Sequence, residues 1–134
     1  MTKIKAAITS IEAYLPEYIL TNEELSRMVD TTDEWIMQRV GIKERRILKG
    51  EGLATSDMGA EATKKLLEKT GTNSDDIDLL LVATVTPDMA FPSTACLIAD
   101  KCGIKNFWGF DVSTACSSFL YTLQTASNFI ETEI

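Results

Sequence analysis

The fold is decided by the stretch FWGFDVSTACSSFLYTL, residues 107–123. Its first six residues are mostly aromatic or β-branched, which indicates a short buried strand. After Cys116 the period changes, because apolar residues recur at helical spacing on one face. These residues are Phe119, Leu123, Ala126 and Ile130. The stretch therefore predicts a strand, a turn that carries a cysteine, and a helix.

Cys116 lies at the predicted start of this helix, among small residues. Unpaired backbone N–H groups and the helix dipole favour negative charge at such a position. Both effects lower the pKa of a thiol and make the nucleophilic thiolate available. The alternative is a small buried cysteine in a packed turn, because free cysteine is among the residue types most often buried. The local pattern leaves both interpretations open.

Composition argues against several classes of protein. The chain has 134 residues, 45% of them hydrophobic, which is enough for one modest domain. A net charge of −7 argues against binding to nucleic acid or to anionic membrane surfaces. No apolar run approaches the length of a membrane span, and the N-terminus leads into a strand pattern, not a signal peptide. We therefore expect a cytoplasmic protein with no nucleic-acid or membrane partner.

The cysteine and histidine content limits the chemistry further. Three cysteines without regular spacing suit a reducing cytosol better than a disulfide framework. No pair among them has the close spacing of a zinc-binding knuckle, so we expect no metal site. The chain has no histidine, so it cannot form a Cys–His or Ser–His pair alone.

The first part of the chain predicts small elements. Residues 3–13 alternate loosely and indicate a strand. Capping boxes at residues 21–24 and 31–34 begin two short helices, the second of which ends at Gly41. Residues 42–48 indicate a basic extended segment.

The second part predicts a layered arrangement. A helix capped by Thr55 or Ser56 and ending at Gly71 precedes the continuous apolar run 79–85. Such a run is typical of a strand buried on both faces, in a parallel sheet with helices on both sides. A nearly all-apolar helix over residues 94–102 follows. The element order predicts an α/β fold with right-handed crossovers.

Cys116 is predicted to be the reactive thiol of the three. Cys96 and Cys102 both lie on the apolar helix 94–102. Burial there raises a thiol pKa, whereas Cys116 lies at a helix start.

Three ordered motifs carry a resemblance to a known family. They are DEWIMQRVGIKERR at residues 33–46, ATVTPDMAFPSTAC at residues 83–96 and FDVSTAC at residues 110–116. Together they resemble β-ketoacyl-ACP synthase III, the thiolase-fold condensing enzyme that initiates bacterial fatty-acid synthesis. The similarity covers nearly the whole chain. It implies the N-terminal half of a thiolase-like fold, layered α/β/α with a mixed, mostly parallel sheet.

The resemblance implies that Cys116 is the catalytic nucleophile. This cysteine accepts an acyl group, typically acetyl, from acyl-CoA. The acyl-enzyme then condenses with malonyl-ACP as carbon dioxide leaves, giving 3-oxoacyl-ACP. The backbone N–H of Cys116 would be one donor of the oxyanion hole. Acyl-CoA and the acyl carrier protein are partners in this reaction, and no cofactor stays bound.

The resemblance also implies roles for residues outside the nucleophile turn. Thr31, Trp35 and Arg39 would contact coenzyme A, with the indole stacked on adenine. The alternative is that Trp35 is a core residue and Arg39 a solvated helix end. Phe91 would lie at a homodimer interface and reach toward the partner's acyl pocket. The alternative is that Phe91 staples the following helix within its own chain.

Two features depart from the family pattern. Ser117-Ser118 replaces the more usual Ala/Ser-Gly pair, and residues 114–118 also resemble the elongating β-ketoacyl-ACP synthases I and II, which leaves the acyl chain preference open. The family has two related halves, and its histidine and asparagine, which polarise the malonyl thioester, lie in the second. We therefore expect residues 1–134 to be an incomplete, truncated domain that is inactive alone and leaves apolar surface on its sheet.

Two other functions are compatible with the sequence. Another thiolase-fold acyltransferase or synthase would use the same cysteine on a different acyl pair. A non-catalytic fragment would hold Cys116 as a structural residue, and its thiol would not react with acyl-CoA.

Overall fold

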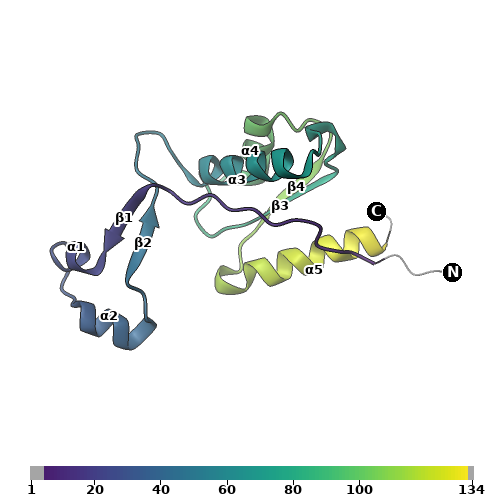
Figure 1. Cartoon of the computed structure of the whole chain (residues 1–134). Coiled ribbons are helices and arrows are strands. Elements are labelled where there is room, and N and C mark those ends of the chain that lie inside the picture. The colour runs from purple at the N-terminus through teal and green to yellow at the C-terminus, as the bar shows by residue number, and fades with distance from the viewer. Residues whose placement is uncertain (1–4, 133–134) are drawn as a thin grey trace. The chain divides into compact units, whose positions relative to one another are not determined.

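The computed structural model describes residues 5–132. Its helices and strands form two compact units, shown in Figure 1. The small unit is Leu15–Leu53, and the large unit comprises the described residues of Met1–Tyr14 and Ala54–Ile134. Each unit has its own two-stranded sheet.

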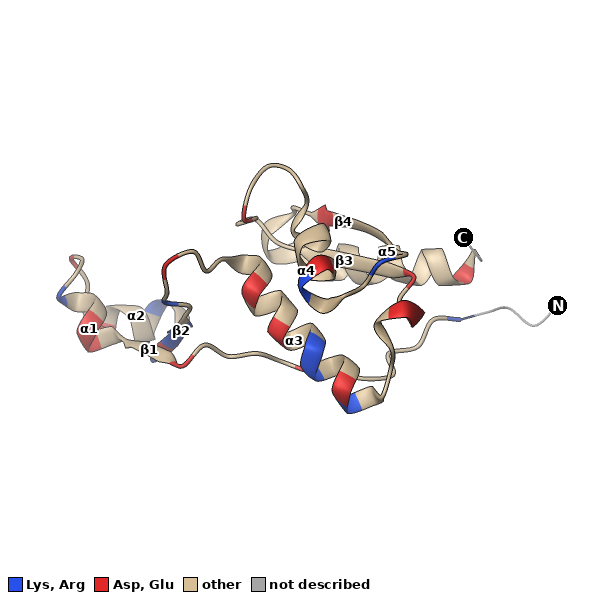
Figure 2. Cartoon of the chain, turned by 90° about the horizontal axis from the view of Figure 1, so that it is seen from above, with Lys and Arg blue, Asp and Glu red and all other residues tan. Residues whose placement is uncertain are grey.

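The small unit consists of two paired strands and two short helices. Strand β1 (Tyr18–Thr21) runs antiparallel to β2 (Glu44–Ile47). Helices α1 (Asn22–Ser26) and α2 (Asp33–Val40) lie between them in the sequence. Figure 2 shows acidic residues on α1 and basic residues on β2. The basic extended segment predicted for residues 42–48 is therefore confirmed as β2.

Asn22 holds the small unit together. Asn22 is only 2% exposed. Its side-chain amide donates to Asp33 Oδ1 at 2.7 Å and to the Ile42 carbonyl oxygen at 2.8 Å. The same amide accepts from Arg45 Nη1 at 2.7 Å. One buried amide thus joins α1, the start of α2 and β2, with both its donors and its oxygen satisfied.

The helix caps of the small unit follow the sequence closely. Thr21 caps α1, as predicted, by accepting from a backbone N–H three residues on at 3.2 Å. The cap of α2 is Thr32, which accepts from Trp35 N at 3.2 Å, so the box predicted one residue earlier has the wrong register. Gly41 ends α2 with a φ of 69°, which a glycine adopts without strain.

The large unit has three layers. Its parallel strands are β3 (Leu79–Ala83) and β4 (Trp108–Val112), in the register Leu79 to Trp108 and Ala83 to Val112. Helices α3 (Thr55–Thr70) and α4 (Thr94–Cys102) lie on one side of the strands, and α5 (Ser118–Glu131) lies on the other (Figure 1). Short 3₁₀ turns, η1 (Ser74–Asp76) and η2 (Ala115–Ser117), precede β3 and α5.

The core of the large unit is built from alanine and isoleucine side chains where α3 packs on α4. Gly59 permits this approach, because a Cβ at that position would collide with the Ile98 side chain. The apolar residues buried around this contact are Ala60, Ala95, Ile98, Ala99 and Ile104. The predicted bounds of α4, Thr94 to Cys102, are confirmed.

The strand predicted over residues 3–13 is wrong for the residues that the structure describes. Residues 5–16 form no strand. Strands need a ladder partner, and this segment is held by α3 side chains instead: Lys69 Nζ donates to the Ile11 carbonyl oxygen at 2.9 Å and pairs with Glu12 at 3.2 Å. Residues 3 and 4 lie outside the described residues.

The apolar face predicted for α5 is exposed. Phe119, Leu123 and Ile130 are 65%, 39% and 49% exposed, whereas Ser118 is only 3% exposed. An apolar groove of about 530 Å³ runs along this face. It is lined by Ala6, Ala7, Ile8, Leu120, Leu123, Gln124, Ala126, Ser127 and Ile130.

Candidate active site

The nucleophile turn, residues 114–118, joins β4 to α5. Within it Ala115 has a φ of 47°, in the left-handed region. A non-glycine residue there costs about 1–2 kcal/mol, so the surrounding structure must impose this conformation. The result is that Cys116 is exposed in η2, between the end of β4 at Val112 and the start of α5 at Ser118.

The buried Ser118 side chain forms hydrogen bonds across the nucleophile turn. Its Oγ accepts from the Thr114 backbone N–H at 2.7 Å and from the Thr114 hydroxyl at 3.2 Å. The first N–H groups of a helix have no carbonyl partner within it. Those of Ala115 and Cys116 stand at this position, and among residues 5–132 neither has a hydrogen-bond partner. The turn therefore presents a thiol and unpaired backbone donors together, which is the arrangement that acyl transfer requires.

Asp111 anchors the end of β4 to α4. Its carboxylate accepts from Thr94 N at 2.7 Å and from Ala95 N at 2.9 Å. Both donors belong to residues that are 0% exposed, and an unpaired N–H there is costly. In the sequence Asp111 stands out only as part of a motif, although an aspartate inside an apolar strand is a usable signal.

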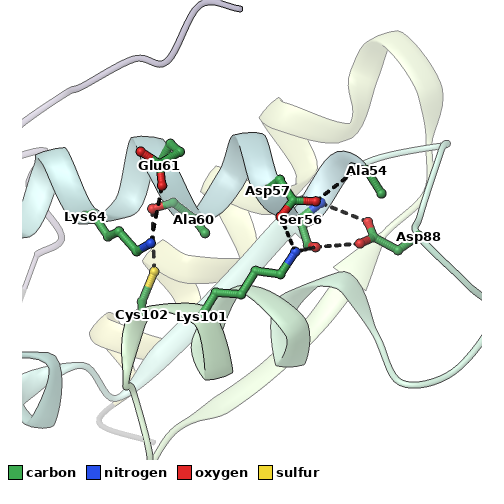
Figure 3. A network of polar contacts seen from close by, with 9 residues as sticks. All are labelled: Ala54, Ser56, Asp57, Ala60, Glu61, Lys64, Asp88, Lys101 and Cys102. Carbon is green, nitrogen blue, oxygen red and sulfur yellow. Dashed lines mark hydrogen bonds and ion pairs between the residues drawn. The ribbon is translucent and has the colours of Figure 1, made fainter. Parts of the chain in front are cut away.

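Figure 3 shows a second polar network, between α3, α4 and the loop after β3. Ser56, which is 0% exposed, donates from its N–H to Asp88 Oδ1 at 2.8 Å and from its hydroxyl to Asp88 Oδ2 at 2.5 Å. Lys101 Nζ donates to Ser56 Oγ at 2.7 Å and to Asp57 Oδ1 at 2.5 Å. The hydrogen bond from Lys101 holds the pKa of Asp57 below its ordinary 3.8, so this contact persists at neutral pH and is lost as the pH falls through the lowered value.

This network explains why the predicted cap of α3 is wrong. The N-cap is Ala54, whose N–H donates to Asp57 Oδ2 at 2.8 Å. Thr55 and Ser56 lie inside the helix, and their hydroxyls bind the loop after β3. The Thr55 hydroxyl donates to the Thr86 carbonyl oxygen at 2.6 Å.

The loop held by this network carries Phe91. Its side chain is 87% exposed. A side chain this exposed does not staple α4, so the alternative interpretation of Phe91 is wrong. The role at a homodimer interface stays a prediction.

The residues predicted to contact coenzyme A lie in the small unit. Trp35 is 57% exposed on α2, where Ile36, at 5%, is the buried residue, so the core interpretation of Trp35 is wrong. The Arg39 guanidinium lies 5.5 Å from the centre of the indole. Thr31 and Trp35 help to line a pocket of about 330 Å³. The buried Thr31 hydroxyl has no hydrogen-bond partner among the described residues, which suits a site that binds a polar ligand.

The three thiols differ less in exposure than the sequence predicts. Cys102 is half-buried, and burial raises the pKa of its thiol, as predicted. Cys96 is exposed, so its predicted burial is wrong. It lies in the first turn of α4, where its Sγ accepts from the Ser93 hydroxyl at 3.2 Å. Exposure alone therefore does not separate Cys96 from Cys116.

We predict that iodoacetamide at neutral pH labels Cys116 fastest, then Cys96, then Cys102. The Asp111 carboxylate already occupies the N-terminus of α4 and disfavours a second negative charge near Cys96. At Cys116, by contrast, η2 begins without a side-chain cap. Peptide mapping by mass spectrometry during the labelling measures the three rates. Faster labelling of Cys96 would contradict this order.

The described residues show neither a metal site nor a membrane span. Among residues 5–132, no three His, Cys, Asp or Glu side chains lie close enough to share a metal ion. Each helix in the same range is too short or too polar to cross a bilayer.

Comparison with known proteins finds relatives of similar sequence, all of them longer than this chain. No family model matches the chain. β-Ketoacyl-ACP synthase III 2 of Bacteroides thetaiotaomicron is 59% identical over 130 residues, which is 97% of this chain and 39% of that protein. β-Ketoacyl-ACP synthase III of Chlorobaculum tepidum is 56% identical over 128 residues, which is 96% of this chain and 39% of that protein. The chain thus spans about 39% of the length of these relatives.

Solved structures match the fold as well. The crystal structure of 3-oxoacyl-ACP synthase III from Aquifex aeolicus superposes with a TM-score of 0.84 and 43% identity, covering 91% of this chain and 39% of that one. The synthase III of Thermus thermophilus gives a TM-score of 0.85 and 38% identity, covering 96% of this chain and 39% of that one.

Proposed function

Because the chain corresponds in sequence and fold to the N-terminal part of β-ketoacyl-ACP synthase III, a thiolase-fold condensing enzyme, we propose that it supplies the nucleophile of an acyl condensation. The substrates are acyl-CoA, typically acetyl-CoA, and malonyl-ACP, and the product is 3-oxoacyl-ACP. The observation that carries this proposal is the nucleophile turn, which exposes Cys116 beside unpaired backbone donors.

The first half-reaction is thioester exchange at Cys116. The Cys116 thiolate attacks the carbonyl carbon of acyl-CoA, and the electron pair of the C=O bond moves to oxygen. The Cys116 N–H donates to this oxyanion. Collapse reforms C=O and breaks the bond to the coenzyme A sulfur, which leaves as a thiolate and takes a proton from solvent. No permanently bound cofactor takes part.

The second half-reaction requires groups that this chain does not contain. Malonyl-ACP loses carbon dioxide, and the resulting carbanion attacks the Cys116 thioester and expels the Cys116 thiolate. The charge that develops on the malonyl thioester oxygen needs a hydrogen-bond donor such as a histidine side chain, and the chain has no histidine. We infer that residues 1–134 are one incomplete thiolase-like domain and do not condense acyl groups alone.

We propose that the small unit binds coenzyme A through Thr31, Trp35 and Arg39. The exposed Trp35 indole can stack on adenine beside the Arg39 guanidinium, which lies 5.5 Å from the centre of the ring, and the Thr31 hydroxyl offers a hydrogen bond. Five basic residues lie between positions 39 and 49, against one acidic residue, which favours the phosphates of coenzyme A.

Trp35→Ala should weaken coenzyme A binding about tenfold, because stacking of one base on an aromatic ring contributes about 1–3 kcal/mol. The fold should be unchanged, since the side chain is 57% exposed. Isothermal titration calorimetry of the protein that carries this chain measures the affinity. Trp108→Ala, which removes a 75% exposed indole from the large unit, is the matched control. Equal weakening in both variants, or in neither, would contradict the role of Trp35.

We also propose that the protein is a cytoplasmic homodimer with Phe91 at the interface. An 87% exposed phenylalanine on an anchored loop supports this, because a monomer gains little from presenting it to water. The exposed apolar face of α5 is covered, in this proposal, by the remaining part of such an enzyme. The reducing cytoplasm agrees with three free cysteines.

The function is tested by incubating the protein that carries this chain with acetyl-CoA and malonyl-ACP. Formation of 3-oxoacyl-ACP is expected. An acyl-enzyme that never gives this product would instead indicate another thiolase-fold acyltransferase or synthase. A Cys116 that is never acylated would indicate a structural cysteine.

A further inference from the structure

Ser118 is the one buried residue of α5 among those described, and its position in the chain makes this unusual. It is 3% exposed, while its neighbours from Thr114 to Ser117 are exposed. Its Oγ accepts two hydrogen bonds, both from Thr114, at 2.7 and 3.2 Å. The side chain therefore bonds back across the nucleophile turn, from the first residue of α5 to the residue that precedes η2.

This bond encloses the strained residue of the turn. Ala115, with its φ of 47°, lies between Thr114 and Ser118, as does Cys116. A left-handed alanine relaxes unless its flanking residues are fixed. In a capping box, the side chain three residues after the cap accepts from the backbone N–H of the cap residue. Here the cap residue is Thr114, and the acceptor is the Ser118 hydroxyl, four residues after it.

We propose that Ser118 is a positioning residue for acyl transfer: its Oγ holds Thr114 so that the Cys116 N–H points to the oxyanion of the thioester adduct. This inference rests on the proposed function and adds a residue to it. Ser118 does not itself touch the substrate, because it is buried and its Oγ lone pairs are both engaged by Thr114. It acts through the orientation of the backbone between positions 114 and 118.

Two reactions of the same thiol separate this role from a general structural one. In thioester exchange the Cys116 sulfur adds to a carbonyl carbon, the C=O pair moves to oxygen, and the adduct needs a backbone donor. In alkylation by iodoacetamide the sulfur displaces iodide from carbon in one step, and no oxyanion forms. A misdirected N–H therefore slows the first reaction and leaves the second unchanged.

The experiment compares Ser118→Ala with the unaltered protein that carries this chain. Acylation of Cys116 by acetyl-CoA should slow about tenfold, a fraction of the effect of deleting an oxyanion donor outright. Alkylation of Cys116 by iodoacetamide should change by less than about twofold, because the thiol stays exposed at the helix start. Both rates are measured by peptide mass spectrometry in single-turnover samples.

Three further variants complete the design. Ser118→Thr keeps the hydroxyl and should restore acylation. Thr114→Val removes the 3.2 Å bond but keeps the 2.7 Å backbone bond, so acylation should fall by less than about threefold. Ser127→Ala removes a serine hydroxyl of α5 away from the turn and should change neither rate.

The outcomes distinguish this inference from the function beneath it. If the unaltered protein is not acylated on Cys116, the proposed function fails and Ser118 has no acylation to support. If the unaltered protein is acylated and Ser118→Ala is acylated equally fast, only the inference fails. An equal slowing of acylation and alkylation also overturns it, because Ser118 would then act on the thiol or the fold as a whole.

Discussion

Replacing Cys116 with alanine is expected to abolish acyl transfer from acyl-CoA, with a loss of about 10⁴-fold or more, as for other covalent nucleophiles. Alanine keeps the backbone donors of the nucleophile turn but has no electron pair with which to attack the carbonyl carbon. The fold should persist, because the Cys116 side chain is exposed and no hydrogen bond of the described residues depends on it. Release of the coenzyme A thiol, followed with a thiol reagent, measures the loss.

The matched controls are the two other thiols of the chain. Cys96→Ala and Cys102→Ala should each retain acyl transfer within about threefold, since neither thiol stands beside unpaired helix-start donors. The first two N–H groups of α4, beside Cys96, are taken by Asp111. Acyl transfer that survives Cys116→Ala and disappears in Cys96→Ala would show that the nucleophile is Cys96 on α4, and would contradict the role of Cys116.

Asp111→Ala is expected to lower the free energy of unfolding by about 2–6 kcal/mol, because it leaves two buried donors without a partner and each costs about 1–3 kcal/mol. The two donors are the N–H groups of Thr94 and Ala95, in residues that are 0% exposed. The variant also loses a negative charge at the N-terminus of α4, which adds about 0.5 kcal/mol. Urea denaturation followed by circular dichroism measures the change.

Two variants calibrate this result. Asp111→Asn keeps one acceptor oxygen and should cost about half as much, since one of the two donors stays paired. Ser93→Ala removes the side-chain cap of the same helix, from Cys96 N, and should cost about 1 kcal/mol. Should Asp111→Ala prove no more destabilising than Ser93→Ala, Asp111 would be an ordinary surface cap and not the anchor of β4.

The elements that could be predicted from the sequence are those whose ends are set by local chemistry. Helix α4 is bounded by the Ser93 cap and by Gly103, with a φ of 71°, and both signals stand in the sequence. Strand β4 and the turn at Cys116 follow from the aromatic and β-branched residues before the turn and from the change in period after Cys116. The Thr21 cap of α1 is local in the same sense.

The elements that could not be predicted depend on partners far along the chain. Thr55 and Ser56 have the composition of helix caps, but the loop after β3 takes their hydroxyls. Residues 3–13 have the loose alternation of a strand, but the described part of this segment forms none, and Lys69 of α3 binds the Ile11 carbonyl oxygen instead. The apolar stripe of α5 is exposed among the described residues, and Ser118, which lies outside this stripe, is the one buried residue of the helix.

The candidate site divides in the same way. Cys116 is a candidate from the local pattern at a predicted helix start, whereas Trp35 and Arg39 are candidates only through the resemblance of their motif to a known family. Asp111 and Ser118 were not assigned roles, since their importance appears only when their hydrogen-bond partners are known. The exposure of Cys96 was missed because a helix of small apolar residues does not show which of its sides faces water.

The most direct test of the central claim is to locate the acyl group. The protein that carries this chain is mixed with acetyl-CoA in the absence of malonyl-ACP, quenched in acid, digested and mapped by mass spectrometry. We expect one acetyl group, held as a thioester on the peptide that contains Cys116 and removed by hydroxylamine. Acetylation of Cys96 or Cys102 instead, or of no cysteine at all, would contradict it.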